Sequence, residues 1–110
     1  MTQFHLIGIG GAGMSVVAEL LAQSGFKVRG SDARASAVTE ALEQQGIKVY
    51  IGQAAENVDP QAIVVVSSAI KDANPELACA RARGQRILHR SQALALASEG
   101  KDFVAVAGAH

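Results

Sequence analysis

Strand-length apolar runs alternate with helix-length segments along the whole chain, and the connections between them are short. The runs typical of strands are residues 4–7, 27–29, 47–51, 63–66, 86–88 and 103–107. The segments with helical character are residues 12–24, 37–45, 53–57, 75–83 and 92–98. Strands joined by such crossovers have to run parallel, with right-handed connections. The pattern therefore predicts an open, doubly wound α/β sheet of about five strands in the order 3-2-1-4-5.

Polar residues and glycines mark where the helices should begin and end. Ser36, Asn74 and Ser91 each suit the N-cap of a following helix, because their side-chain oxygens can accept a backbone N–H bond. Pro75 stands at the first helical position, which proline favours. Glycines at positions 25, 46, 84 and 100 follow helical segments and suit helix ends.

The composition fits a buried parallel sheet of the Rossmann-like class. Hydrophobic residues make up 49% of the chain but aromatic residues only 4%, so we expect a core of Ala, Val, Ile and Leu. The run Ile63–Val66 is β-branched throughout, which is typical of a central strand covered on both faces. At 110 residues, the chain is long enough for one such core.

Charge, cysteine content and the length of the apolar runs exclude several classes of function. Ten basic and ten acidic residues cancel without forming a like-charged block, so neither nucleic acid nor a membrane surface is an expected partner. The chain has one cysteine, Cys79, no run that could span a bilayer and no visible signal peptide, so we expect a cytoplasmic protein. No metal site is expected, because His5 and His89 have no Cys, Asp or His partner at ligand spacing. His5 lies within a strand and is expected to be packed or hydrogen-bonded.

The first strand candidate leads directly into a glycine-rich loop, Gly8-Ile9-Gly10-Gly11-Ala12-Gly13. Gly8 and Gly10 let the backbone turn sharply and approach a ligand, and Gly13 is expected to let the helix pack closely on the strand. The unpaired N–H groups and the positive dipole end of the following helix favour an anion. The loop therefore predicts a nucleotide-phosphate site, and the alternative is a tight turn needed only for packing.

Two further loops should meet this one, because doubly wound sheets bind ligands where the strand order reverses, here between the first and fourth strands. Asp32 ends the second strand, where an acid commonly accepts hydrogen bonds from a ribose or base; the alternative is a solvated or helix-capping carboxylate. Ser67 and Ser68 follow the fourth strand, and they either contact the nucleotide or form a turn. Three interpretations are open for Arg90: it binds a phosphate, it faces a neighbouring domain, or it is an ordinary surface arginine.

Several stretches, in chain order, resemble the N-terminal domain of the Mur ligase family, and they cover essentially the whole chain. They are His5-Leu6-Ile7-Gly8-Ile9-Gly10-Gly11-Ala12-Gly13-Met14-Ser15, Gly30-Ser31-Asp32, Val66-Ser67-Ser68-Ala69-Ile70 with Asn74-Pro75-Glu76, His89-Arg90-Ser91, and Val104-Ala105-Val106-Ala107-Gly108-Ala109-His110. The first stretch is the most specific, because a plain dinucleotide motif does not require the second glycine pair and the Met-Ser that follows.

The resemblance implies a multidomain ligase that joins L-alanine to the lactyl carboxylate of UDP-N-acetylmuramic acid, a cytoplasmic step of peptidoglycan synthesis. ATP would phosphorylate that carboxylate, and the amine of alanine would attack the acyl phosphate. Residues 1–100 would hold the UDP of the substrate, residues 101–110 would begin a central domain that binds ATP and Mg²⁺, and a third domain would close over the amino acid. Gly108-Ala109-His110 resembles the opening of the central domain's phosphate loop, without its lysine and hydroxyl. We therefore expect the chain to bind the UDP-sugar, to bind neither ATP nor Mg²⁺, and to be inactive without its partner domains.

The resemblance also implies which residues hold the UDP. The backbone N–H groups of residues 10–13 would carry the diphosphate, and Asp32 would accept a hydrogen bond from the uracil N3–H or a ribose hydroxyl. The full set is Gly10, Gly11, Ala12, Gly13, Met14, Asp32, Ser67, Ser68, Ala69 and Arg90. In one place the chain departs from the family: relatives often have Gly-His after the third strand, where this chain has Gly52-Gln53. Glutamine cannot titrate near neutrality, so a base or ribose contact at this position is not carried over.

Other interpretations remain beside this one. The glycine loop and Asp32 also fit an NAD- or FAD-binding module, although nothing after the fourth strand resembles a second nucleotide site or a hydride-transfer residue. A tripeptide-recycling member of the same family has a first domain with the same task, and a scaffolding domain without a ligand has little support. The strand candidate 103–107 would belong to the ATP-binding domain, so we expect it to be disordered, to join this domain's own sheet or to pair with a second copy.

Overall fold

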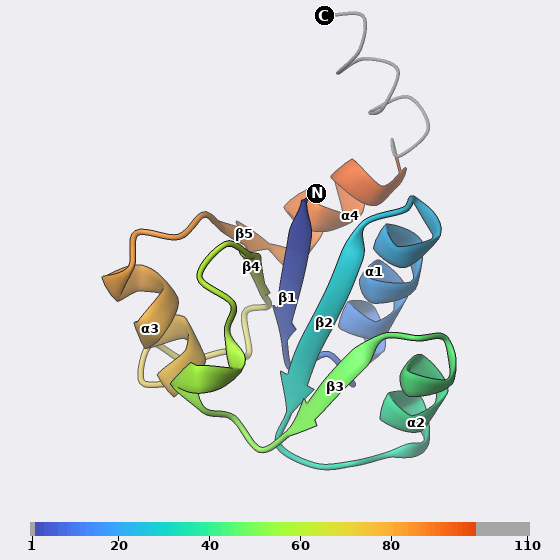
Figure 1. The fold of residues 1–110 in the computed structure, drawn as a ribbon, viewed down its shortest axis with the longest axis horizontal. Helices are drawn as coiled ribbons and strands as arrows, with labels where there is room; N and C mark the ends of the chain where they lie inside the picture. Colours follow the sequence, from blue (N-terminus) through green and yellow to red (C-terminus); the bar gives the residue numbers. More distant parts are fainter. Residues whose placement is uncertain (1, 99–110) are drawn as a thin grey trace, which may run out of the picture.

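The computed structural model describes residues 2–98, and its centre is a five-stranded parallel sheet (Figure 1). The strands are β1 (Gln3–Ile7), β2 (Lys27–Asp32), β3 (Lys48–Ile51), β4 (Ile63–Val66) and β5 (Ile87–His89). They lie in the order β3-β2-β1-β4-β5, and each neighbouring pair is parallel. This confirms the doubly wound α/β fold and the strand order predicted from the sequence.

Helices cover both faces of the sheet (Figure 1). One face carries α1 (Ala12–Gln23), α2 (Ala37–Gln44) and α4 (Arg90–Ser98), and the other carries α3 (Pro75–Ala82) and the 3-10 turn η1 (Ala55–Asn57). Because successive side chains of a strand point to opposite faces, Leu6 of β1 packs in the larger cluster with α1, α2 and α4. Its neighbour Ile7 packs in the smaller cluster with α3.

The strand register brings three connections to one edge of the sheet. On β1, Ile7 lies opposite Ser31 of β2, and Leu6 lies opposite Val65 of β4. The chain therefore leaves β1, β2 and β4 at the same carboxyl edge. This is the point where the strand order reverses and where doubly wound sheets bind ligands.

Several element boundaries differ from the sequence-based expectations, and two of the differences have a clear physical reason. β2 continues to Asp32 instead of ending at residue 29, because Gly30 and Ser31 are buried and pair with both neighbouring strands. β5 ends at His89, and α4 begins at Arg90, so Ser91 lies inside the helix that it was expected to cap. The strand candidate 103–107 lies outside the described residues. Within residues 2–98, no helix has the length and apolar character needed to cross a membrane.

Candidate functional site

A cavity of about 380 Å³ lies at the carboxyl edge of the sheet. It is lined by Gly8, Gly11, Ala12, Gly13, Met14, Asp32, Ser67, Ser68, Ala69, Ile70 and Arg90. The structure thus brings together every residue that the sequence analysis assigned to UDP binding except Gly10, and it adds Gly8 and Ile70. The role of these residues in binding stays a prediction.

Backbone hydrogen bonds fold the glycine loop onto the end of β2. The N–H groups of Gly8 and Ile9 both donate to the carbonyl oxygen of Ser31, at 2.8 and 2.9 Å. The φ angle of Gly8 is +78°, in the left-handed region that glycine adopts without strain. The Gly11 N–H donates to the Gly8 carbonyl oxygen at 3.0 Å and closes the turn.

Asp32 holds the same loop with its side chain. Its Oδ2 atom accepts a hydrogen bond from the Gly10 N–H at 2.9 Å, and its Oδ1 atom accepts one from the Arg34 N–H at 3.3 Å. A Cβ atom at position 10 would lie 2.8 Å from Oδ2, so this approach requires glycine. The carboxylate therefore organises the loop, a role that the sequence analysis did not consider. Its contact with a ribose or a uracil stays a prediction.

The free N–H groups of the loop lie in the first turn of α1. Those of Gly10 and Gly11 are already bonded within the protein, and the contact of the amides of residues 10–13 with a diphosphate stays a prediction. The N–H groups of Ala12, Gly13 and Met14 have no acceptor within residues 2–98. The first turn of α1 has neither a side-chain cap nor an acidic residue. The cavity wall thus carries three backbone donors at the positive end of a helix dipole.

Arg90 brings a positive charge to the same helix end. It is the first residue of α4, and its guanidinium group lies where a Cβ atom of Gly13 would be. The missing side chain of Gly13 therefore makes room for Arg90, and not for a strand as the sequence analysis expected. In the part of the chain that the structure describes, the guanidinium group has no hydrogen-bond or ion-pair partner. Because a helix N-terminus favours negative charge, a cation at the start of α1 and α4 indicates an anion site.

The loop after β4 forms a second wall of the cavity. Ser67 shapes a turn: its carbonyl oxygen accepts from the Ile70 N–H at 3.1 Å, and its Oγ atom accepts from the Ala69 N–H at 3.4 Å. Ser68 is exposed, lines the cavity and lies 3.3 Å from His89 Nε2 through its Oγ atom. Ser67 therefore forms a turn and also lines the cavity, and the contact of Ser67 and Ser68 with a ligand stays a prediction.

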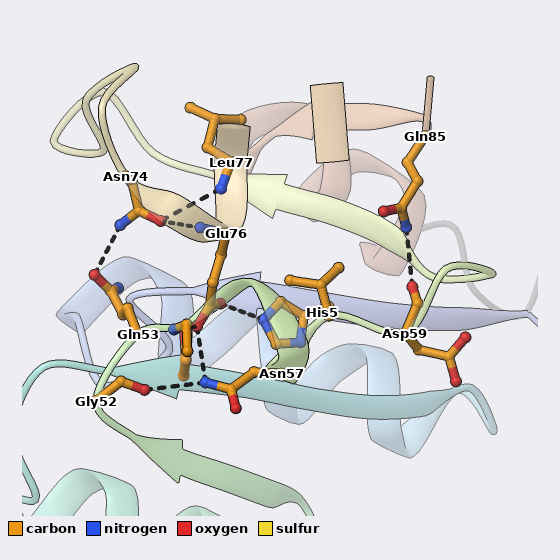
Figure 2. A network of polar contacts seen from close by, with 12 residues as sticks. His5, Gly52, Gln53, Asn57, Asp59, Asn74, Glu76, Leu77 and Gln85 are labelled. Carbon is orange, nitrogen blue, oxygen red and sulfur yellow. Dashed lines mark hydrogen bonds and ion pairs between the residues drawn. The ribbon is translucent and has the colours of Figure 1, made fainter. Parts of the chain in front are cut away.

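A buried carboxylate that the sequence analysis did not assign, Glu76, is the centre of a network of polar contacts (Figure 2). Its Oε1 atom accepts hydrogen bonds from His5 Nε2 and Ser31 Oγ, both at 2.6 Å. Its Oε2 atom accepts from the Ala54 N–H at 3.1 Å and from Asn57 Nδ2 at 3.0 Å. Glu76 therefore joins β1, β2, the segment after β3 and α3.

This network supports the glycine loop through Ser31, whose hydroxyl donates to Glu76 and whose carbonyl oxygen accepts from the start of the loop. His5 is fully buried and hydrogen-bonded, which confirms the expectation for a histidine within a strand. Burial acts to raise the pKa of Glu76, but the hydrogen bonds from His5, Ser31 and Asn57, together with attraction to His5, outweigh it. The pKa therefore lies below its usual value of 4.5, and Glu76 is ionised at neutral pH.

Gln53, where the chain departs from the family pattern, does not line the cavity. Asn74 caps α3, as predicted, because its Oδ1 atom accepts from the N–H groups of Glu76 and Leu77 at 2.9 and 3.3 Å. Its Nδ2 atom donates to Gln53 Oε1 at 2.7 Å (Figure 2). Gln53 thus links the segment after β3 to the start of α3.

Among residues 2–98, no group of three or more His, Cys, Asp or Glu side chains could hold a metal ion. Cys79 is a free, half-buried cysteine of α3. The residues assigned to the ATP loop, Gly108, Ala109 and His110, lie outside the described residues.

Comparison with known families agrees with this geometry. The model of the Mur ligase family, catalytic domain, matches residues 3–102, a range that includes the whole sheet and every residue of the cavity. The chain belongs to the Mur ligase family. The resemblance inferred from the glycine loop and the later motifs is thereby confirmed for this Mur ligase domain.

Curated relatives of this Mur ligase domain include UDP-N-acetylmuramate–L-alanine ligases of two bacteria. A UDP-N-acetylmuramate–L-alanine ligase of Bifidobacterium longum subsp. infantis is 58% identical over 106 residues, which are 96% of this chain and 21% of the relative. The UDP-N-acetylmuramate–L-alanine ligase of Thermobifida fusca is 56% identical over 106 residues, 96% of this chain and 22% of the relative. The chain therefore spans about a fifth of the length of these relatives.

Solved structures of Mur ligases share the fold. The UDP-N-acetylmuramate-alanine ligase of Thermotoga maritima matches with a TM-score of 0.80 and 33% identity, over 84% of this chain and 21% of that one. The UDP-N-acetylmuramate:L-alanyl-gamma-D-glutamyl-meso-diaminopimelate ligase of Neisseria meningitides matches with a TM-score of 0.75 and 29% identity. That match covers 82% of this chain and 29% of the other.

Proposed function

We propose that this Mur ligase domain holds the UDP of UDP-N-acetylmuramate in an enzyme that adds L-alanine to that nucleotide sugar. The observation that carries the proposal is the start of α1, where three backbone donors and the guanidinium of Arg90, none of them paired within residues 2–98, border one cavity. A diphosphate has the charge and the acceptor oxygens that such a helix end binds. The printed names of relatives up to 58% identical support the choice of nucleotide sugar and amino acid.

Each part of the cavity has a task in this proposal. The N–H groups of Ala12, Gly13 and Met14 donate to the oxygens of the diphosphate, and Arg90 adds charge-assisted hydrogen bonds. Asp32 accepts a hydrogen bond from a ribose hydroxyl or the uracil N3–H through Oδ1, whose one partner within residues 2–98 is the Arg34 N–H at 3.3 Å. The domain therefore binds and orients the nucleotide sugar.

The rest of the reaction is assigned to other parts of the enzyme. Residues 101–110 would begin the domain for ATP and Mg²⁺, which when bound supply the phosphoryl group that activates the lactyl carboxylate of the sugar. The proposed place of the reaction is the cytoplasm, in peptidoglycan synthesis. On this proposal, residues 1–100 bind the substrate without catalysing its ligation.

Isothermal titration calorimetry of the 110-residue chain tests the proposal with UDP-N-acetylmuramate, UDP and NAD⁺. Both uridine ligands should bind, and Arg90→Ala should weaken them about tenfold, because it removes charge-assisted hydrogen bonds to phosphate. Arg86→Ala is the matched control, since Arg86 is exposed, precedes β5 at the opposite edge of the sheet and changes the net charge equally. The control should bind UDP within about twofold of wild type. Tight binding of NAD⁺ without binding of UDP would contradict the proposal and favour a dinucleotide-binding module.

A second candidate is the first domain of a tripeptide-recycling ligase, which the match to the Neisseria structure at a TM-score of 0.75 supports. Its printed name contains the same nucleotide sugar, so the two candidates differ in the group that is added. Among the solved structures, the alanine-adding ligase of Thermotoga maritima is 33% identical and the tripeptide ligase 29%. The curated alanine-adding ligases, at 56% and 58% identity, favour the first candidate. Ligation assays of the complete enzyme with L-alanine and with the tripeptide would separate them.

A further inference from the structure

His89 ends β5 and caps α4 with its imidazole ring. Its Nδ1 atom accepts a hydrogen bond from the Ser91 N–H at 3.1 Å and lies 2.9 Å from Ser91 Oγ. The N–H of His89 donates in return to Gln92 Oε1 at 2.8 Å, so the two residues form a reciprocal pair of the capping-box type. The capping role that the sequence analysis gave to Ser91 therefore belongs to His89.

Capping fixes the position of the proton on the ring. A backbone N–H can only donate, so Nδ1 has to present a lone pair to Ser91. A neutral imidazole with a free lone pair on Nδ1 carries its proton on Nε2. Because Nε2 lies 3.3 Å from Ser68 Oγ, the Nε2–H donates to the Ser68 hydroxyl oxygen.

The hydrogen bond from His89 determines which group Ser68 presents to the cavity. Its oxygen accepts from His89, so its hydroxyl hydrogen is left for another acceptor, and no such acceptor is found within residues 2–98. Ser68 is exposed and lines the cavity that also contains the free N–H groups of α1. His89 thus leaves Ser68 with a hydrogen-bond donor for whatever occupies that cavity.

We propose that His89 is a positioning residue that orients the Ser68 hydroxyl toward a phosphate oxygen of bound UDP. The proposal rests on the proposed function, because it names a further contact in the same site. Without His89, the exposed Ser68 side chain is free to populate its three staggered rotamers, and its hydroxyl can turn in any direction. Loss of this orientation should weaken UDP binding about fivefold, the effect of one hydrogen bond.

Two isosteric variants separate positioning from capping. In His89→Asn, the side-chain oxygen can take the place of Nδ1 and keep the cap, but the side chain does not reach Ser68. In His89→Gln, the amide nitrogen can take the place of Nε2 and donate to Ser68, but the cap acceptor is lost. We expect His89→Asn to keep the Tm and lose about fivefold in UDP affinity, and His89→Gln to lower the Tm with affinity within about twofold of wild type. The proposal is overturned if His89→Gln, the variant with the lower Tm, is the one that loses UDP affinity, or if neither variant changes affinity.

A combined variant and the nitrogen NMR signals of His89 give independent readouts. Ser68→Ala should weaken UDP binding at least as much as His89→Asn, and the combined variant should show no loss beyond that of Ser68→Ala, because both act through one hydroxyl. Additive losses would overturn the proposal. In the chain without ligand, the neutral ring of His89 should carry its proton on Nε2 and not on Nδ1, and the opposite tautomer would overturn the proposal as well.

The wild-type chain distinguishes failure of this inference from failure of the proposed function. If wild type does not bind UDP, the proposed function is wrong and the inference falls with it. If wild type binds UDP and Arg90→Ala weakens that binding while His89→Asn does not, only the inference is wrong.

Discussion

Position 13 has to be glycine for Arg90 to reach the start of α1, because a Cβ atom there would overlap the guanidinium group. Arg90 is exposed and flexible, so an alanine at position 13 would displace its side chain without preventing folding. Gly13→Ala should preserve or raise the Tm, since alanine favours a helix over glycine by about 0.5–1 kcal/mol. The same variant should lower UDP affinity about tenfold, because the displaced charge no longer meets the phosphate. Thermal unfolding and calorimetry measure these two effects.

The cause of the effect at Gly13 is tested by combining it with Arg90→Ala. In the combined variant, the alanine at position 13 should add little to the loss caused by Arg90→Ala, because the group that it displaces is gone. A Gly13→Ala variant that binds UDP as tightly as wild type would show that the position of Arg90 over Gly13 is unimportant for binding.

At this scale, the sequence indicates which residues border the cavity but not which atoms they offer. The glycine pattern and the strand order place Gly13, Asp32, Ser68 and Arg90 at one edge of the sheet, as the structure does. That Asp32 binds the Gly10 N–H, and that Arg90 lies over Gly13, depends on side-chain positions that no local pattern contains.

At the scale of elements, the carboxylate of Glu76 joins β1, β2, α3 and the segment after β3. Glu76→Gln would place an amide NH₂ toward one of these pairs of donors, whichever way the amide turns. We expect a loss of about 2–4 kcal/mol in the free energy of unfolding at neutral pH, measured by chemical denaturation. Glu40→Gln is the matched control, because Glu40 is an exposed acid in the first turn of α2, and it should change stability by less than about 0.5 kcal/mol.

Low pH should remove the stabilisation that the ionised Glu76 carboxylate provides. A group whose pKa is lower in the folded state stabilises the fold above its unfolded value, 4.5 for Glu76, and this contribution is lost as the pH falls through the lower folded value. The stability of the wild type should therefore fall below about pH 5, and the advantage over Glu76→Gln should shrink in parallel. The unfolding free energies of the wild type and Glu76→Gln are measured against pH. If the difference between them stays constant down to about pH 3, the stabilising role of the Glu76 carboxylate is contradicted.

The sequence predicts element boundaries well where the local signal is specific. Asn74 and Ser36 cap their helices as expected. The predicted start of α4 was wrong, because histidine is not among the usual capping residues and the nearby Ser91 is. β2 was too short in the prediction because burial between β1 and β3 outweighs the low strand propensity of Gly30 and Asp32.

For the whole molecule, the described residues that line the cavity lie between positions 8 and 90, and we expect UDP binding to depend on them. A chain that ends at residue 100 should bind UDP within about twofold of the 110-residue chain, as measured by calorimetry. A large loss of affinity would show that the final residues contribute to the site.

Size-exclusion chromatography of both chains tests whether residues 103–107 pair two copies of the chain. If both chains elute as monomers, the pairing of two copies is contradicted.

The global topology was predictable, whereas the buried network was not. Alternating elements, short connections and right-handed crossovers leave few arrangements of a parallel sheet, so the strand order follows from the sequence pattern. His5 and Glu76 are 71 residues apart, and each has an ordinary local explanation as a strand residue and a helix-start acid. Only the folded chain brings them together beneath the glycine loop.

The guanidinium of Arg90 is exposed at the meeting point of two helix starts, so its field extends into the surrounding electrolyte. Dissolved ions screen such a charge within a Debye length of about 8–10 Å at ordinary ionic strength. The association rate of a doubly charged nucleotide with this domain would therefore be highest in dilute buffer and would fall in concentrated salt. The contacts with the uncharged parts of the ligand would change little.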